Sequence, residues 1–160
     1  MPALAQTAAE ADVKAAFLFK FAGYVEWPAS YFPTTEAPIV IGVSSSDEVA
    51  SSLEALVPGR NINGRPVIVK RLRAGEVPQA VHIVFFGRSE RNLRAAIRTS
   101  QQQGALVVTE LDRALEQGAA INFVPVEDRI GFEVSLDSAE RSGLRISARM
   151  LGVARRVLPR

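Results

Sequence analysis

The chain has 160 residues, of which 48% are hydrophobic and 22% charged, and its formal net charge is +2. This length and composition predict one globular domain with a sizeable core and exclude a disordered or low-complexity protein. The sequence has no Cys, which excludes disulfide bonds and thiol catalysis. Basic residues are interleaved with acidic ones, so no stripe of positive charge predicts a nucleic-acid partner.

An apolar helix is predicted at the start of the chain. Val13, Phe17 and Phe21 recur at a spacing of four, which places them on one helical face. Neighbouring apolar residues widen this face, so the helix needs cover on more than one side. The apolar run is about half the roughly 20 residues of a membrane span and contains Lys20. We therefore expect a core or interface helix that ends before Pro28.

Beyond this helix, short apolar runs alternate with amphipathic segments. The runs predict strands at 39–43, 67–72, 81–86 and 105–109, with intervening helices at 46–57 and from an N-cap at Ser89 to Gly104. A short helix at 111–117, a hairpin of 121–124 and 130–134, a helical turn at 137–142 and a closing helix at 146–158 follow. This alternation predicts an α/β fold: a Rossmann-like, mostly parallel sheet of about six strands, with helices on both faces and an antiparallel edge hairpin.

The N-terminus carries the motif Ala3-Leu4-Ala5, which has the small-x-small form of a signal-peptidase site. The charged and hydrophobic regions that would precede such a site are missing, and short Ala-rich tripeptides also arise by chance. From the residues alone, export stays open. We expect residues 1–8 to be the remnant of a signal peptide or a disordered N-terminus, and residues 9–160 to form a single domain.

Few side chains suit catalysis or metal binding. The single His82 lies in an apolar strand without an acidic neighbour, which favours a hydrogen-bonded core histidine over a catalytic base. No cluster of His and Cys predicts a metal site, and neither a nucleophile elbow nor a nucleotide-binding fingerprint occurs. An enzyme would need Glu110, Asp112 or His82 to meet in one pocket. We predict no catalytic residue, no metal and no cofactor.

Two groups of residues are candidates for binding. In an open parallel sheet, ligands bind at the carboxyl ends of strands where the strand order reverses. There the segments Ser44-Ser45-Ser46 and Gly87-Arg88-Ser89 could hold an anion, with helix N-cap and tight-loop roles as the alternative.

The second group comprises aromatic and basic residues near the end of the first helix. Trp27, Tyr31 and Phe32 either seal the end of the core or form an exposed contact patch. Together with Phe19 and Lys20, they are the candidate partner or dimer surface.

Several stretches together resemble one family, the YfiR-like periplasmic proteins. The likeness runs in order through Val13–Phe21, Val25–Pro28, Ile39–Val43, Gly59–Val67, His82–Phe86, Ser89–Glu90, Ile121–Val124, Phe132–Val134 and Leu144–Leu151. Each motif is weak by itself, but together they cover almost the whole chain from Val13.

This resemblance implies an exported, homodimeric, Rossmann-like regulator without catalytic activity. It implies repression of a membrane-bound diguanylate cyclase, and so control of cyclic-di-GMP signalling, through binding to the periplasmic part of that enzyme. A sensor kinase of the inner membrane is the other candidate partner, and an outer-membrane lipoprotein is a candidate for sequestering the regulator. The alternative function is a periplasmic sensor of a small anion or nucleotide-like ligand. The chain departs from the pattern in lacking Cys pairs and in having Ser135 where we expect Asn, which leaves the role of that position open.

Overall fold

The computed structural model describes residues 2–76 and 78–159, with side chains described from Ala9 onward. Its helices are α1 (Pro2–Tyr24), the short 3-10 helix η1 (Ala29–Tyr31), α2 (Asp47–Leu56), α3 (Leu93–Gln102), α4 (Leu136–Arg141) and α5 (Ala148–Val153). Its strands are β1 (Val25–Glu26), β2 (Ile39–Ser44), β3 (Asn61–Ile62), β4 (Arg65–Leu72), β5 (Ile83–Phe86), β6 (Leu106–Thr109), β7 (Ile121–Val126), β8 (Arg129–Ser135), β9 (Arg145–Ile146) and β10 (Arg156–Leu158).

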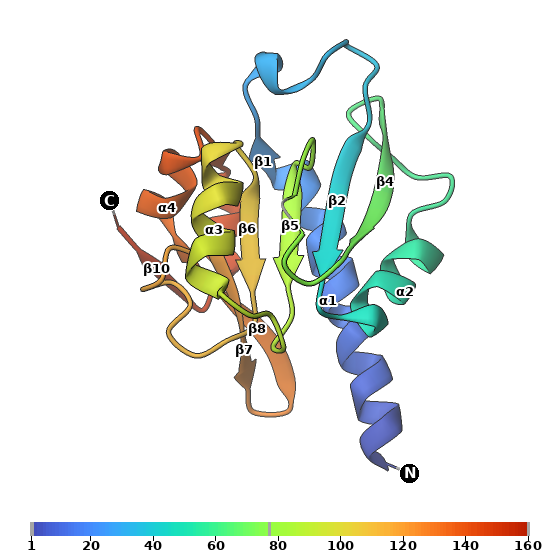
Figure 1. The fold of residues 1–160 in the computed structure, drawn as a ribbon. Helices are drawn as coiled ribbons and strands as arrows, with labels where there is room; N and C mark the ends of the chain where they lie inside the picture. The colour runs from blue at the N-terminus through green and yellow to red at the C-terminus, as the bar shows by residue number, and fades with distance from the viewer. Residues whose placement is uncertain (1, 77, 160) are drawn as a thin grey trace.

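The architecture is an eight-stranded, mostly parallel sheet in the order β10-β8-β7-β6-β5-β2-β4-β3 (Figure 1). Strands β4, β2, β5, β6 and β7 pair in parallel, whereas β8 runs antiparallel to β7 and β3 runs antiparallel to β4. Strand β10 lies beyond the hairpin and pairs in parallel with β8, and β1 and β9 form a separate antiparallel pair. The predicted fold class is confirmed, with short edge strands that the sequence did not indicate.

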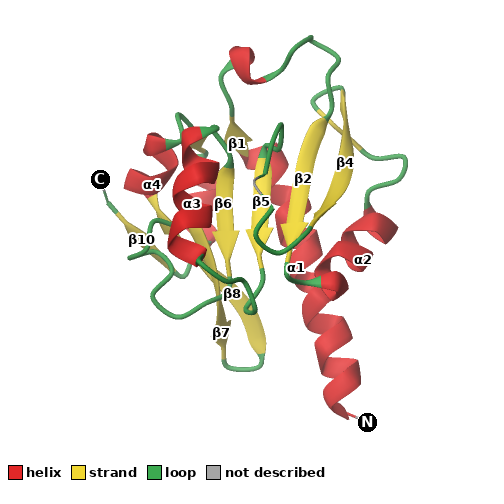
Figure 2. Ribbon diagram, viewed as in Figure 1, coloured by secondary structure: helices red, strands yellow, loops and turns green. Residues whose placement is uncertain are grey.

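Two apolar clusters lie on opposite faces of this sheet. On one face, Leu18 and Phe21 of α1 and Leu53 of α2 are buried in the cluster that also holds alternate residues of the central strands. On the other, Leu93 and Ile97 of α3 are buried in a second cluster. Figure 2 shows α1 behind the sheet and α3 in front of it. Every residue of β5 and β6 is buried, because strands covered on both faces need apolar side chains in both directions.

Helix α1 is held by an aromatic cluster over the β7–β8 hairpin. The ring of Phe21 meets that of Phe132 edge-on at 5.1 Å between centroids, and Phe17 does the same at 5.4 Å. On its other flank α1 contacts α2, and it also contacts α5. The prediction of a core helix covered on more than one side is confirmed. None of the helices in the described part of the chain is long and apolar enough to cross a membrane.

Three predictions about local structure are wrong. The segment 111–118 forms a series of hydrogen-bonded turns instead of a helix, and Arg113 has a positive φ of 59°. Helix α3 begins at Leu93 after Asn92, so Ser89 is not its N-cap. The closing segment is divided into β9, α5 and β10, with Ser147 as the N-cap of α5.

The backbone of α1 begins at Pro2. The side chains of the predicted signal-peptidase motif, Ala3-Leu4-Ala5, lie outside the described residues. The predicted boundary between an N-terminal remnant (residues 1–8) and the domain (residues 9–160) therefore stays a prediction.

Candidate functional site

The strand order reverses at β2, which lies between β4 and β5. Ser44 at the end of β2 is paired in register with Phe86 at the end of β5, and the Gly87 N–H donates a 2.8 Å hydrogen bond to the Ser44 carbonyl. The two predicted segments, Ser44–Ser46 and Gly87–Ser89, therefore lie side by side at the carboxyl edge of the sheet, where a ligand site is expected.

The carboxylate of Glu90 occupies the space between these segments. The Ser44 hydroxyl donates to Glu90 Oε1 at 2.5 Å and the Ser45 hydroxyl donates to the same oxygen at 2.8 Å. The Gly75 N–H makes a longer contact of 3.4 Å with Oε2. Only 9% of the Glu90 surface is exposed. Two hydroxyl donors that an anion would need are thus already bonded to a residue of the chain.

Glu90 is not among the residues that the sequence analysis singled out, although it directly follows Ser89. A carboxylate one position after a predicted anion cradle is the sequence signal that could have revealed it. Gly87 explains how closely the two loops approach, because a Cβ there would collide with the Ser45 carbonyl oxygen and lie 2.8 Å from its carbon.

The other predicted ligand residues surround a hollow next to Glu90. Ser46 caps α2 by accepting a 3.3 Å hydrogen bond from the Val49 N–H. Ser45, Ser46, Arg88 and Ser89 line a hollow of about 450 Å³, whereas Ser44 and Gly87 are buried beside it. The structure brings these residues together, and ligand binding by them stays a prediction.

An ion-paired group adjoins this hollow, and two of its members, Arg88 and Glu110, line it. Lys14 Nζ of α1 lies 2.8 Å from Glu110 Oε2, a contact that has the geometry of an ion pair and not of an aligned hydrogen bond. Arg88 Nε lies 3.5 Å from the other oxygen of Glu110. The side chains of Lys14 and Glu110 are 10% and 12% exposed, whereas that of Arg88 is 72% exposed. Glu110 therefore links α1 to the loop after β5.

The aromatic residues of the second candidate group close the opposite edge of the sheet. The Trp27 indole N–H donates to the His82 carbonyl at 3.1 Å, and the Tyr31 hydroxyl donates to the Ser142 carbonyl at 2.9 Å. Phe32 stacks on the His82 ring, and the Arg65 guanidinium lies 3.7 Å from the centre of the Phe32 ring. Because all three rings are half-buried, they seal the end of the core and keep only part of their surface for contact.

The same group borders a second hollow. Trp27 and Phe32 line it together with Ala22 of α1 and Ile62 of β3, and its volume is about 270 Å³. Tyr31 is not among the lining residues and bonds toward α4. Phe19 lies one turn before Ala22 on α1, half-buried under the Arg60 guanidinium, and Lys20 is exposed. The structure thus brings Trp27 and Phe32 together, with Phe19 and Lys20 on the adjoining helix.

His82 has the structural role that the sequence predicted. Its Nδ1 accepts a 3.1 Å hydrogen bond from the Val40 N–H, so the proton is on Nε2, which donates to the Tyr31 carbonyl at 3.0 Å. Burial lowers the pKa of His82, the bond to Tyr31 acts in the opposite direction, and the nearby Arg65 charge lowers it further. The protein therefore holds this imidazole in its neutral form.

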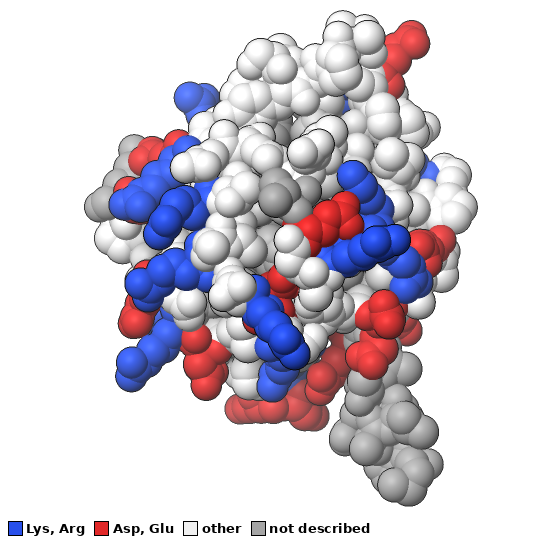
Figure 3. All heavy atoms as spheres, in the orientation of Figure 1, with Lys and Arg blue, Asp and Glu red and all other residues white. Residues whose placement is uncertain are grey.

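The surface shows no concentration of one charge on the face in Figure 3, where acidic and basic side chains are interspersed. Within residues 2–76 and 78–159, no group of three or more His, Asp or Glu side chains is placed to hold a metal ion.

The chain matches a known protein family. A family model described as YfiR/HmsC-like covers residues 11–155, a span that includes the body of α1 and every strand of the sheet except β10. No curated protein matches the chain. The matched span contains all the stretches from Val13 to Leu151 that carry the resemblance in the sequence. The chain therefore belongs to the YfiR/HmsC-like family.

Proposed function

We propose that this protein is a periplasmic regulator that binds and represses a membrane-bound signalling protein. The family match over residues 11–155 carries this proposal, because the YfiR/HmsC-like family is known for periplasmic regulators of cyclic-di-GMP signalling. The partner in this proposal is the periplasmic part of a diguanylate cyclase, with a sensor kinase of the inner membrane as the alternative partner. An outer-membrane lipoprotein would sequester the regulator.

The placement of the acid–base groups supports a role without catalysis. His82 precedes β5 and Glu110 follows β6, and since these strands are parallel the two side chains lie at opposite edges of the sheet. Both ring nitrogens of His82 are hydrogen-bonded, and Glu110 is paired with Lys14 and Arg88. The groups that an enzyme would need to combine are therefore separated and engaged with other parts of the fold.

The hollow beside Trp27 and Phe32 supports a binding surface at the sealed end of the core. Its lining is largely apolar, with Arg65 on one side and Glu26 on another, so it suits an apolar side chain from a partner inside a polar rim. Lys20 is exposed on the adjoining part of α1. In this proposal Phe19, Lys20, Trp27, Tyr31 and Phe32 form or support the partner surface.

The same surface is our candidate for a homodimer contact. Phe19 is half-buried and covered by Arg60 on its open side, so a second copy could displace the guanidinium and bury the ring. Sedimentation should show a dimer that Phe19→Glu converts to a monomer. A strict monomer at every concentration, unchanged by Phe19→Glu, would remove the homodimer from the proposal.

A genetic experiment tests the regulatory function. Deletion of the gene should raise the cellular cyclic-di-GMP level, and the wild-type gene should restore it. Complementation with Lys20→Glu should fail, whereas the matched charge reversal Lys70→Glu, at an exposed position on β4, should succeed. An unchanged cyclic-di-GMP level in the deletion strain would contradict repression of a cyclase.

A second candidate function is sensing of a small anion or nucleotide-like ligand. It is motivated by the hollow of about 450 Å³ at the strand-order reversal, where Arg88, Ser46 and Ser89 are brought together. The carboxylates of Asp47, Glu48 and Glu110 line the same hollow, so an anion there would depend on Arg88. A ligand that binds only the folded state raises the melting temperature, so thermal-shift screening with inorganic phosphate and nucleotides is the test. A shift that Arg88→Ala abolishes would support this function, and no shift with any of these anions would eliminate it.

A further inference from the structure

A further cavity lies next to the 450 Å³ hollow that Arg88 lines (the Arg88 hollow), and Ser45 and Ser89 line both. Its volume is about 670 Å³, and it opens between the loop after β4 and the beginning of α3. Small apolar side chains form much of its wall, contributed by Ala74, Pro78, Ala95 and Ala96. Its polar lining comprises Ser45, Glu76, Ser89, Glu90, Arg91, Asn92 and Thr99. A volume of this size, with an apolar stretch of wall beside polar groups, suits a small molecule.

Glu90 gives this cavity a buried negative charge without a cation. Its hydrogen bonds come from the Ser44 and Ser45 hydroxyls and from the Gly75 N–H, all of them uncharged donors. No ion pair formed by the described residues includes Glu90. A carboxylate offers about four acceptor positions, so capacity for at least one more donor remains. Buried charges are normally paired, and here the protein does not supply the partner.

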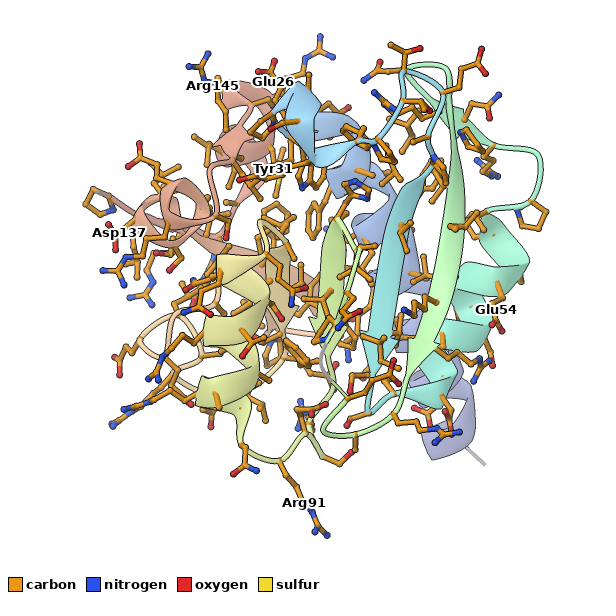
Figure 4. The ribbon with its side chains drawn as sticks, turned by 45° about the horizontal axis from the view of Figure 1, so that its top comes forward. Glu26, Tyr31, Glu54, Arg91, Asp137 and Arg145 are labelled. Atoms are coloured by element: carbon orange, nitrogen blue, oxygen red, sulfur yellow. The ribbon has the colours of Figure 1, made fainter. Side chains whose placement is uncertain are left out.

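The charged residues around the cavity leave Glu90 unneutralised. Glu76 also lines the cavity and adds a second carboxylate. Arg91 contributes to the rim, but Figure 4 shows its side chain pointing away from the body of the protein. Arg88 contacts Glu110 at the neighbouring hollow. The cavity is therefore acidic at its polar end and apolar along its wall.

We propose that this cavity binds a small organic cation, an alkylamine or short diamine with a primary ammonium group. The ammonium would donate to Glu90, the carbon chain would lie along the alanine and proline wall, and a second ammonium would reach Glu76. Ammonium–carboxylate hydrogen bonds are charge-assisted and are strengthened where water is excluded. This site is separate from the proposed partner surface at the opposite edge of the sheet, so it does not depend on the proposed function.

The test is calorimetric titration of the full chain with 1,4-diaminobutane. The wild type should bind it, and 1,4-butanediol, which has the same carbon chain without charge, should not bind. Glu90→Gln keeps the shape and an acceptor oxygen but removes the charge, and should weaken diamine binding by roughly 10- to 100-fold. Glu48→Gln is the matched control, because Glu48 is exposed and lines the Arg88 hollow instead of this cavity.

A second variant tests the cavity independently, in case Glu90→Gln does not fold. Ala95→Leu fills the wall at an exposed position without touching the Glu90 hydrogen bonds, and should also weaken diamine binding. Circular dichroism checks that each variant is folded. Absence of diamine binding to the wild type, or equal binding by wild type, Glu90→Gln and Ala95→Leu, would overturn the proposal. Inorganic phosphate competing with the diamine for the cavity would overturn it too, because the site would then favour anions.

Discussion

Phe32 is stacked on His82, with ring centroids 4.3 Å apart and an angle of 14° between the planes. Arg65 lies over Phe32, so a guanidinium, a phenyl ring and an imidazole form a column at the end of the core. Trp27 approaches the same imidazole edge-on at 6.0 Å. The column ties the aromatic loop to β5, and it places a titratable ring beneath the proposed partner surface.

This column makes stability depend on pH. Burial lowers the pKa of His82 below the ordinary value of about 6.5, and a protonated Nδ1 would lose the hydrogen bond from Val40. The unfolded chain therefore takes up the proton at a higher pH than the folded chain. The free energy of unfolding should be constant above about pH 6.5 and should fall as the pH decreases from there toward the pKa of the folded state.

Urea unfolding between pH 7.5 and 5.5 measures this dependence. His82→Gln is the control, because His82 is the single His in the sequence and carboxylates titrate at lower pH. The slope should be much weaker in His82→Gln. A wild-type protein that became more stable as the pH fell through this range would contradict the neutral assignment.

The second prediction concerns the packing of Tyr31 against Gly104. The φ of Gly104 is +81°, and a Cβ there would collide with the Tyr31 ring, with Cζ only 2.7 Å away. Gly59 has a similar φ of +76°, and no atom lies within 4 Å of the position that a Cβ would take there. Both Ala variants bear the cost of a left-handed conformation, about 1 kcal/mol, but only Gly104→Ala also displaces Tyr31. It should be less stable than Gly59→Ala by roughly 1–3 kcal/mol in urea unfolding. Equal destabilisation by the two variants would show that Tyr31 is not held against Gly104.

The third prediction concerns the buried pair of Lys14 and Glu110. Lys14→Met leaves the Glu110 carboxylate with only the exposed Arg88 as a cationic partner, and should lower the free energy of unfolding by about 1–3 kcal/mol. Lys14→Met combined with Glu110→Leu removes both charges and should recover much of this loss. A double variant as unstable as the sum of its single changes would argue against coupling between the two side chains. Arg71→Ala, in an exposed pair with Glu54 on α2, should change stability less.

Local patterns in the sequence predicted the elements whose burial follows a simple period. The continuous apolar run at Ile39–Val43 is buried in β2, and Ser46 caps α2 as its position indicates. The placement of Ser44–Ser46 next to Gly87–Ser89 assumed that the second and third predicted strands lie on opposite sides of the first, and the structure has this order.

Elements fixed by distant contacts could not be predicted in this way. The segment after β6 is irregular because the Asn122 side chain accepts from the Leu111 N–H and from the Thr109 hydroxyl, an arrangement made possible by β7. Helix α5 ends at Val153, with Ala154 as its C-cap, because the following residues Arg156–Leu158 pair with Glu133–Ser135 of β8. Val153, at the end of α5, is 72% exposed.

The sequence predicted where the candidate site lies but not that the Glu90 carboxylate lies within it. Ser44 and Ser45 were expected to donate to an external anion, and they donate to Glu90 instead. The sequence shows a carboxylate directly after Ser89, but not the direction of its side chain, which depends on the start of α3 at Leu93. Ser45 and Glu90 also line the neighbouring cavity, and anion binding by the predicted residues stays a prediction.

The most direct test of the regulatory role is binding between the purified protein and the isolated periplasmic segment of an inner-membrane diguanylate cyclase from the same organism. We expect saturable binding. Lys20→Glu should weaken it at least about tenfold, because one charged contact at the interface is lost. Lys70→Glu should leave the binding unchanged. Absence of binding to the periplasmic segments of all membrane cyclases and sensor kinases of that organism would contradict the proposed function.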